Sequence, residues 1–161
     1  MNDLVNKFVA ALGIGALLLW VHTPSAAKLN EEVWLITPEE AGMAPAEEVP
    51  GGGEFKIGSE EMDLGPKIEV LKPTNGGSAP PPVEVLIKFL PNPKAVDLAS
   101  LIVSVVKLFT IDITDRVRDH ATADGIHVQQ AKIPAGKHKV RISIADIDGL
   151  RSVKDVTFEV L

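Results

Sequence analysis

The sequence predicts an all-β fold, an antiparallel β-sandwich of about seven strands, and three observations lead to this prediction. Runs of alternating apolar and polar residues recur along residues 67–161, and a period of two gives a strand one buried and one solvent-facing side. Proline and glycine residues separate these runs and mark the turns between strands. No segment repeats another, which argues against a solenoid or a propeller. We therefore expect one sandwich domain over residues 67–161, behind two N-terminal segments of different composition.

The first 27 residues have the layout of a secretory signal peptide. Lys7 precedes an uncharged run over residues 8–21, and the small residues Ser25 and Ala27 occupy the −3 and −1 positions of a cleavage site. The alternative is an uncleaved membrane anchor, but a helix of this length spans about 21 Å, short of the ~30 Å hydrocarbon core. We therefore expect export, cleavage after Ala27, and a periplasmic or extracellular location.

Residues 28–66 carry ten acidic residues and two lysines, together with glycines and prolines. Such a composition buries little apolar surface and predicts an extended acidic linker. The chain has a net charge of −6, and outside this linker positive and negative charges nearly balance. Because a surface that binds nucleic acid is strongly basic, we do not expect nucleic acid as a partner.

An apolar cluster interrupts the linker and consists of Val33, Trp34, Leu35 and Ile36. Directly after it, Thr37, Pro38 and Glu40 match a capping box with proline at the first helical position, which predicts a short helix near residues 38–44. One hypothesis is that the cluster engages a protein partner. The alternative is that Trp34 tucks against the sandwich, or that the segment is a short strand on its edge.

The expected strands in the first half of the domain lie at residues 67–71, 83–89 and 101–109, followed by a short strand that ends at Ile113. The run 101–109 is the most apolar and is rich in β-branched residues. These properties predict a central strand that is covered on both faces.

A helical turn is expected between Ile113 and Gly125, where apolar residues recur at helical spacing. Asp112 or Thr114 is expected to cap it, and Gly125 to close it. Its charged residues are expected to form a solvated face, and they are Asp115, Arg116, Arg118 and Asp119.

The remaining strands are expected at residues 126–133 and in a hairpin over residues 136–160. Asp148 and Gly149 mark the turn of this hairpin, since the pair tolerates the positive φ angles of a primed turn. His138 falls on the apolar face of its strand and is expected to be a partly buried structural residue. Three phenylalanines are expected to face the core, namely Phe89, Phe109 and Phe158.

Four stretches carry a resemblance to a known family, and they are Pro66-Lys-Ile-Glu-Val-Leu-Lys-Pro, Asp97-Leu-Ala-Ser-Leu-Ile-Val, Ile133-Pro-Ala-Gly-Lys-His and Val156-Thr-Phe-Glu-Val. With them, residues 66–161 resemble the bacterial immunoglobulin-like and fibronectin type III-like β-sandwich modules of exported proteins. The resemblance implies an immunoglobulin-like sandwich. It implies no single activity, because this sandwich serves adhesion, assembly, enzyme-accessory and spacer roles alike.

The sequence offers no constellation for catalysis. It contains no cysteine, no serine lies in a nucleophile elbow, and no histidine pair has the spacing of a helical zinc site. We therefore expect no catalytic residue, no enzyme activity and no cofactor. Asp146 and Asp148 are candidate calcium ligands, although an aspartate before Gly149 is also what a tight turn selects.

The function predicted from the sequence is that of an exported, non-enzymatic interaction or assembly module of the bacterial cell envelope. It would bind a protein partner through a sheet edge or through residues 33–44. One alternative is a calcium- or glycan-binding accessory module. Another is a single-span accessory subunit of a membrane complex, which would contact the membrane only if residues 1–27 are not cleaved.

Overall fold

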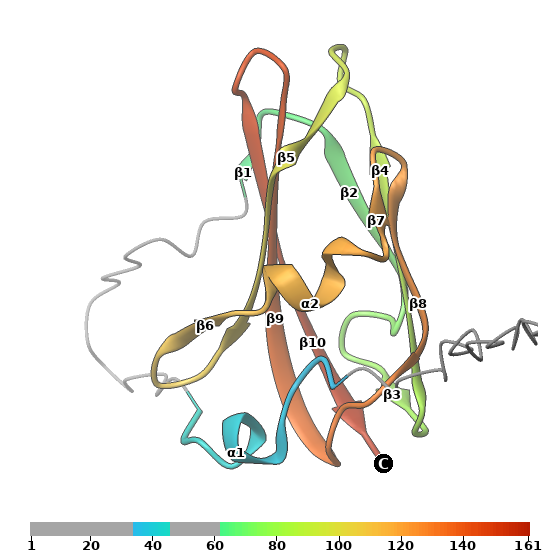
Figure 1. Cartoon of the computed structure of the whole chain (residues 1–161), viewed down its shortest axis with the longest axis vertical. Coiled ribbons are helices and arrows are strands. Elements are labelled where there is room, and N and C mark those ends of the chain that lie inside the picture. The colour runs from blue at the N-terminus through green and yellow to red at the C-terminus, as the bar shows by residue number, and fades with distance from the viewer. Residues whose placement is uncertain (1–33, 46–61) are drawn as a thin grey trace, which may run out of the picture. The chain divides into compact units, whose positions relative to one another are not determined.

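The computed structural model describes residues 34–45 and 62–161, and these belong to one compact unit (Figure 1). The predicted signal peptide and Val33 lie outside the described residues. Within the described part of the chain, no helix combines the length and the apolar character needed to cross a membrane.

Two β-sheets face each other and form a sandwich, which confirms the all-β prediction (Figure 1). The first sheet has the order β1-β10-β9-β5-β6, with β3 beside β10, and the second has the order β2-β4-β8-β7. Strands of the first sheet are β1 (Met62–Asp63), β3 (Ser78–Ala79), β5 (Val96–Val106), β6 (Thr110–Asp112), β9 (Gly136–Asp146) and β10 (Arg151–Val160). Strands of the second are β2 (Lys67–Lys72), β4 (Val83–Leu90), β7 (Ala121–Thr122) and β8 (Gly125–Ala131), and the helices are α1 (Pro38–Ala41) and α2 (Thr114–Arg118).

The hairpin predicted at the C-terminal end is present as β9 and β10, which pair antiparallel over their whole length. Gly149 has a φ of 85°, and its N–H donates to the carbonyl of Asp146 at 2.9 Å. The Asp146 carboxylate also accepts hydrogen bonds from the backbone N–H groups of Asp148 and Leu150, each at 2.9 Å. Local turn chemistry therefore sets the register that places His138 opposite Phe158.

The core lies between the sheets and is built from the inward side of each strand. Phe89 and Phe158 belong to it, but Phe109 is 71% exposed, so its predicted core position is wrong. The reason is that β5 ends at Val106, where the chain turns and the N–H of Lys107 donates to the carbonyl of Phe109 at 3.1 Å. The apolar run 101–109 therefore extends three residues beyond the end of β5, into a turn.

The helical turn predicted after Ile113 is α2, which buries Val117. The expected cap at Asp112 or Thr114 is wrong, because the N-cap residue is Ile113 and no side chain makes the capping hydrogen bond. Asp112 lies before the cap and accepts the N–H of Thr114 at 2.8 Å. The prediction that Gly125 closes the helix is wrong, because α2 ends at Arg118 and Gly125 begins β8 instead. Its φ of 147° is one that other residues rarely adopt.

Replacing Gly125 with alanine should destabilise the sandwich more than the same change at Gly136. Both glycines have positive φ, but an added Cβ would lie 2.0 Å from the carbonyl oxygen of Ile87 at Gly125 and meets nothing within 4 Å at Gly136. We expect Gly136→Ala to lower the free energy of unfolding by about 1 kcal/mol, from backbone strain alone, and Gly125→Ala by at least twice that. Urea denaturation of the two variants measures the difference, and equal losses would contradict the steric argument.

Candidate functional site

Residues 34–45, here called the N-terminal arm, pack against one end of the sandwich. Trp34 forms an isolated parallel bridge with Lys132, and the N–H of Leu35 donates to the carbonyl of Lys132 at 3.1 Å. Leu35 and Ile36 are only 3% and 1% exposed, whereas Trp34 is 42% exposed. Residues 34–45 therefore pack on the sandwich mainly through Leu35 and Ile36, and Trp34 stays partly exposed beside Lys132.

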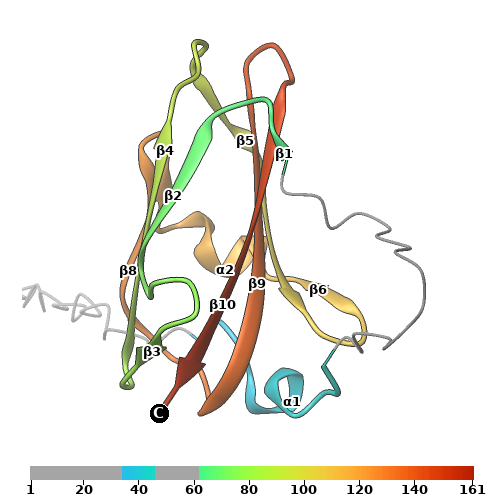
Figure 2. The same cartoon turned by 180° about the vertical axis from the view of Figure 1, so that it is seen from behind.

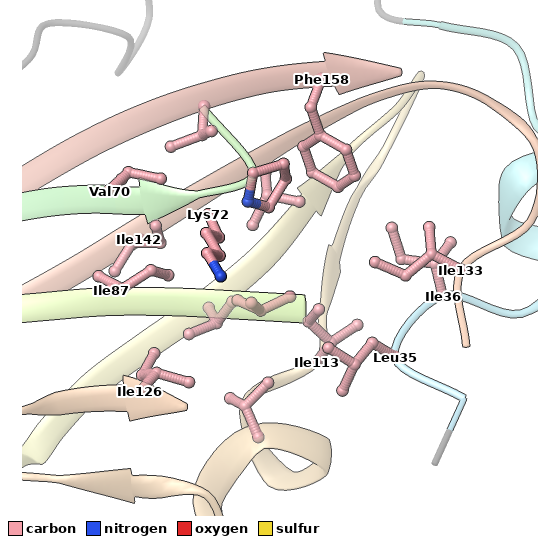
Figure 3. Close-up of a pocket in the computed structure, with 16 residues that line it drawn as sticks. Leu35, Ile36, Val70, Lys72, Ile87, Ile113, Ile126, Ile133, Ile142 and Phe158 are labelled. Carbon is pink, nitrogen blue, oxygen red and sulfur yellow. The ribbon is translucent and has the colours of Figure 1, made fainter. Parts of the chain in front are cut away.

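The side chains of Leu35 and Ile36 enter the space between the sheets (Figure 3). There they line an internal cavity of about 40 Å³, together with Ile133 and Phe158. Figure 3 shows Leu35 pointing toward Ile113 and Ile36 toward Ile133. The cavity is small and its walls are almost entirely apolar, so it is a packing gap in the core and not a substrate site.

Helix α1 follows these two residues and is fixed by the capping box expected from the sequence. The Glu40 carboxylate accepts the N–H of Thr37 at 2.9 Å, and the Thr37 hydroxyl accepts the N–H of Glu40 at 3.3 Å. Two of the backbone donors at the start of the helix are therefore satisfied. The box also orients Glu40 toward the sandwich, where it is buried.

Glu40 forms a bidentate ion pair with Arg116 of α2. Two guanidinium nitrogens donate to the two carboxylate oxygens at 2.7 Å each, and one of them also donates to the carbonyl of Leu35 at 3.0 Å. The hydrogen bond from Arg116 lowers the pKa of Glu40 from 4.5 to about 2, against the opposing effect of burial. In turn, Glu40 raises the pKa of Arg116.

The other charged residues of α2 behave differently from Arg116. Arg118 and Asp115 form an exposed ion pair at 3.4 Å, as expected for a solvated face. The same expectation is wrong for Arg116, whose side chain reaches the arm.

The end of the arm meets the hairpin between β5 and β6. The Lys107 ammonium donates to the carbonyl of Ala41 at 3.1 Å, and the N–H of Leu108 donates to the carbonyl of Ala44 at 2.8 Å. In both views, α1 and this hairpin lie at the same end of the sandwich (Figure 1 and Figure 2).

Three large apolar side chains are exposed at this junction. They are Met43 at 42%, Leu108 at 58% and Phe109 at 71%, and we call them the hairpin patch. Strand β6 follows Phe109 directly and ends the first sheet, and among the described residues it pairs with β5 alone. Sequence reasoning missed this surface because it placed Leu108 and Phe109 in a buried strand.

The two candidate calcium ligands take part in turn and ion-pair contacts. Asp146 is 1% exposed and its carboxylate holds the turn, while Asp148 is exposed and pairs with Lys94 at 3.4 Å. No group of three or more histidine, aspartate or glutamate side chains that could hold a metal ion occurs in residues 34–45 and 62–161. Their contacts are those of turn residues.

His138 and His127 lie in different environments. His138 is 2% exposed, its Nε2 lies 2.8 Å from the carbonyl of Pro134, and its ring packs on Phe158. Burial lowers the pKa of His138, which favours the neutral ring. His127 belongs to the other sheet and lies 3.2 Å from the Glu84 carboxylate. Among the contacts of the described residues, no serine hydroxyl hydrogen-bonds to either ring.

No protein-family model matches the sequence, and no curated protein matches it. Among solved structures, the chain is similar to an endo-beta-1,4-mannanase from Thermotoga petrophila, with a TM-score of 0.42 and 15% sequence identity. The similarity covers 66% of this chain and 22% of the mannanase chain. It spans a small part of that protein and carries no argument about activity.

Replacing Glu40 with glutamine should loosen the arm. The change removes the charge that pairs with Arg116, and we expect the free energy of unfolding at pH 7 to fall by about 1–3 kcal/mol. Because the folded-state pKa of Glu40 lies below its ordinary value, its stabilising effect is complete above about pH 4.5 and is lost as the pH falls toward 2. The difference between the wild type and Glu40→Gln should therefore shrink over that range.

Urea denaturation at a series of pH values provides this measurement. Glu39→Gln is the matched control, since Glu39 lies in the same helix and is exposed. A loss of equal size in the two variants would show that the ion pair does not hold the arm.

Proposed function

We propose that this chain is an exported, non-enzymatic, immunoglobulin-like module of the bacterial cell envelope that binds a protein partner through the edge of its first sheet. The strand orders β2-β4-β8-β7 and β10-β9-β5-β6 support the immunoglobulin-like assignment. These orders match those of the ABED and GFC sheets of such domains, and the first sheet has three further strands, β1, β3 and β6. The resemblance of residues 66–161 to modules of exported proteins supports the same assignment.

The observation that carries the proposal is the hairpin patch beside β6. Soluble proteins usually protect edge strands with charges, prolines or covering segments, because unpaired backbone groups attract other strands. Here the edge strand is preceded by Leu108 and Phe109, both exposed. Among the described residues, β6 has a pairing strand on one side only. An apolar anchor next to such an edge is the arrangement used in β-augmentation, in which a partner adds a strand to the sheet. The partner is therefore an extended segment with apolar side chains.

The C-terminal end of the arm contributes to this surface, and its first residues do not. Leu35 and Ile36 are buried in the core of their own domain, so they serve the partner site indirectly by holding the arm in place. Met43 is exposed and belongs to the hairpin patch. Deleting the arm would expose core residues, and single substitutions on the surface are the cleaner test.

Replacing Phe109 with aspartate should weaken partner binding at least tenfold while the sandwich stays folded. The charge would lie in the centre of an apolar contact, and the removal of one such anchor costs more than about 1.4 kcal/mol of binding free energy. Ile147→Asp is the matched control, because Ile147 is 64% exposed and follows β9 at the turn that lies at the opposite end of the sandwich (Figure 1). Tagged full-length variants, purified from envelope extracts, report the amount of partner retained. Equal retention by both variants would refute the proposed surface.

Export is tested by the mass of the mature protein. Cleavage after Ala27 predicts that the protein recovered from the cell envelope begins at Lys28. Mass spectrometry of its N-terminus makes the measurement. A protein that retains residues 1–27 would instead support the single-span alternative.

A further inference from the structure

His138 lies in β9 on the side that faces the core. The residue is 2% exposed, and its ring packs on Phe158 with the two ring centres 5.8 Å apart. Its Nε2 lies 2.8 Å from the carbonyl oxygen of Pro134, and because a carbonyl only accepts, Nε2 carries the proton of the neutral ring. Its Nδ1 is buried and has no hydrogen-bond partner among the described residues. The site therefore fits a neutral imidazole with an unprotonated Nδ1.

A second proton on this ring would be buried without a partner. It would bind to Nδ1 and create both a donor without an acceptor and a charge away from water, and each costs free energy. Burial lowers the pKa of His138, the hydrogen bond to Pro134 opposes this shift, and the charge of Lys107 adds to it. Protonation is therefore favourable only where the ring gains access to water.

The charged groups of the first sheet do not offset a charge on His138. Lys107, in the turn after β5, has the same sign and is only 7% exposed. Two further lysines flank the histidine in β9, and because successive side chains of a strand alternate, they lie on the other face of the sheet. They are Lys137 and Lys139. The residue opposite His138 in β10 is Phe158, which is apolar.

The carboxylates nearest in the arm and in the facing sheet are already paired. Glu40 of the arm binds Arg116 through both of its oxygens. Glu84 of β4 accepts a hydrogen bond from the Lys72 ammonium at 2.6 Å. Each carboxylate has a cation of its own, so neither is available to neutralise a protonated His138.

Residues 132–134 connect His138 with the N-terminal arm. At one end of this segment, the carbonyl of Lys132 accepts the N–H of Leu35 at 3.1 Å. At the other end, the carbonyl of Pro134 is held by the His138 ring. A movement of the ring would therefore act on the segment to which the arm is bound.

Two side chains beside His138 also adjoin the arm. The Lys107 ammonium, whose charge acts on the ring, donates to the carbonyl of Ala41 at 3.1 Å. Phe158, on which the ring packs, lines the internal cavity together with the two buried residues of the arm (Figure 3). A positive charge on His138 would repel Lys107 and disturb the apolar contacts that hold the arm.

Opening at the arm is the least costly way for water to reach the ring. On its other sides, β9 is paired with β10 and with β5, whereas the arm contributes two buried apolar residues and one short helix. Local opening of a small element costs less than unfolding of the domain. We propose that protonation of His138 releases the N-terminal arm, so that docking of the arm depends on pH.

The pH range of this release follows from the two states of the ring. In the released state the ring reaches water and its pKa returns to its ordinary value near 6.5, whereas in the docked state the pKa is lower. The released state therefore binds the extra proton, so docking is strongest above about pH 6.5 and weakens as the pH falls toward the lower value. Over this range, the ratio of released to docked chains should rise by up to about tenfold per pH unit. The Glu40 ion pair is lost only below about pH 4.5, in a separate range.

Hydrogen exchange of the full-length chain measures the release without a partner. The N–H of Leu35 is bonded to Lys132 and exchanges when the arm leaves. Its protection factor, which compares the observed rate with that of an unstructured chain at the same pH, should fall about tenfold between pH 7 and pH 5. The N–H of Asp146, bonded to the carbonyl of Leu150 at the other end of the sandwich (Figure 1), should keep its protection.

His138→Gln should remove the pH dependence of the Leu35 protection factor. The glutamine side chain can donate an amide N–H to Pro134 in place of Nε2, and it does not titrate in this range. His127→Gln is the matched control, since His127 is an exposed histidine of the other sheet and undergoes the same substitution. It should show the same fall as the wild type.

Nitrogen NMR of the His138 ring is a second measurement, and it uses the wild-type chain. The neutral ring should carry its proton on Nε2, and the docked chain should take up the second proton only below the ordinary pKa of histidine. A neutral ring protonated on Nδ1, or a pKa at or above 6.5, would contradict the proposal.

Three results of the exchange experiment would overturn it as well. They are an unchanged Leu35 protection factor between pH 7 and pH 5, the same fall in His138→Gln, and an equal fall at Asp146, which would mean that protonation unfolds the whole sandwich. Met43 leaves with the arm, so acid would also disrupt the hairpin patch, a consequence that rests on the proposed function. Exchange needs no partner, and the two proposals therefore fail separately.

Discussion

The rest of the structure depends on how the N-terminal arm closes one end of the sandwich. Leu35 and Ile36 fill the space between the sheets, and burial of such side chains contributes about 1.5–3 kcal/mol each. The bidentate pair between Glu40 and Arg116 lies beside them. A buried ion pair adds little net stability, because desolvation offsets most of the attraction. The apolar residues therefore supply the stability, and the ion pair fixes the position of the arm.

This closure also positions the hairpin patch. Met43 lies beyond α1 and belongs to that patch. The N–H of Leu35 donates to Lys132 at the beginning of the arm, and the N–H of Leu108 donates to Ala44 at its end. A disturbance of the Glu40 ion pair would therefore reach the hairpin patch through the arm, although the patch does not include Glu40.

Features that depend on neighbours in sequence could be predicted, and features that depend on distant contacts could not. The alternation of β9 and β10, their turn at Gly149 and the capping box of Thr37 and Glu40 each arise within a few residues. Arg116 lies 76 residues from Glu40, so the sequence showed only a charged helical face. Lys107 lies 66 residues from the carbonyl of Ala41 that it reaches. This long-range contact lies where the chain turns after β5 and where Phe109 is exposed, although the apolar pattern alone predicted a continuing strand.

The hairpin patch lies beside β6, which pairs with β5 alone among the described residues. The proposed binding at this patch would draw on the burial of apolar side chains and on hydrogen bonds between strands. Neither contribution depends on a charged pair, so association at the hairpin patch should respond little to ionic strength.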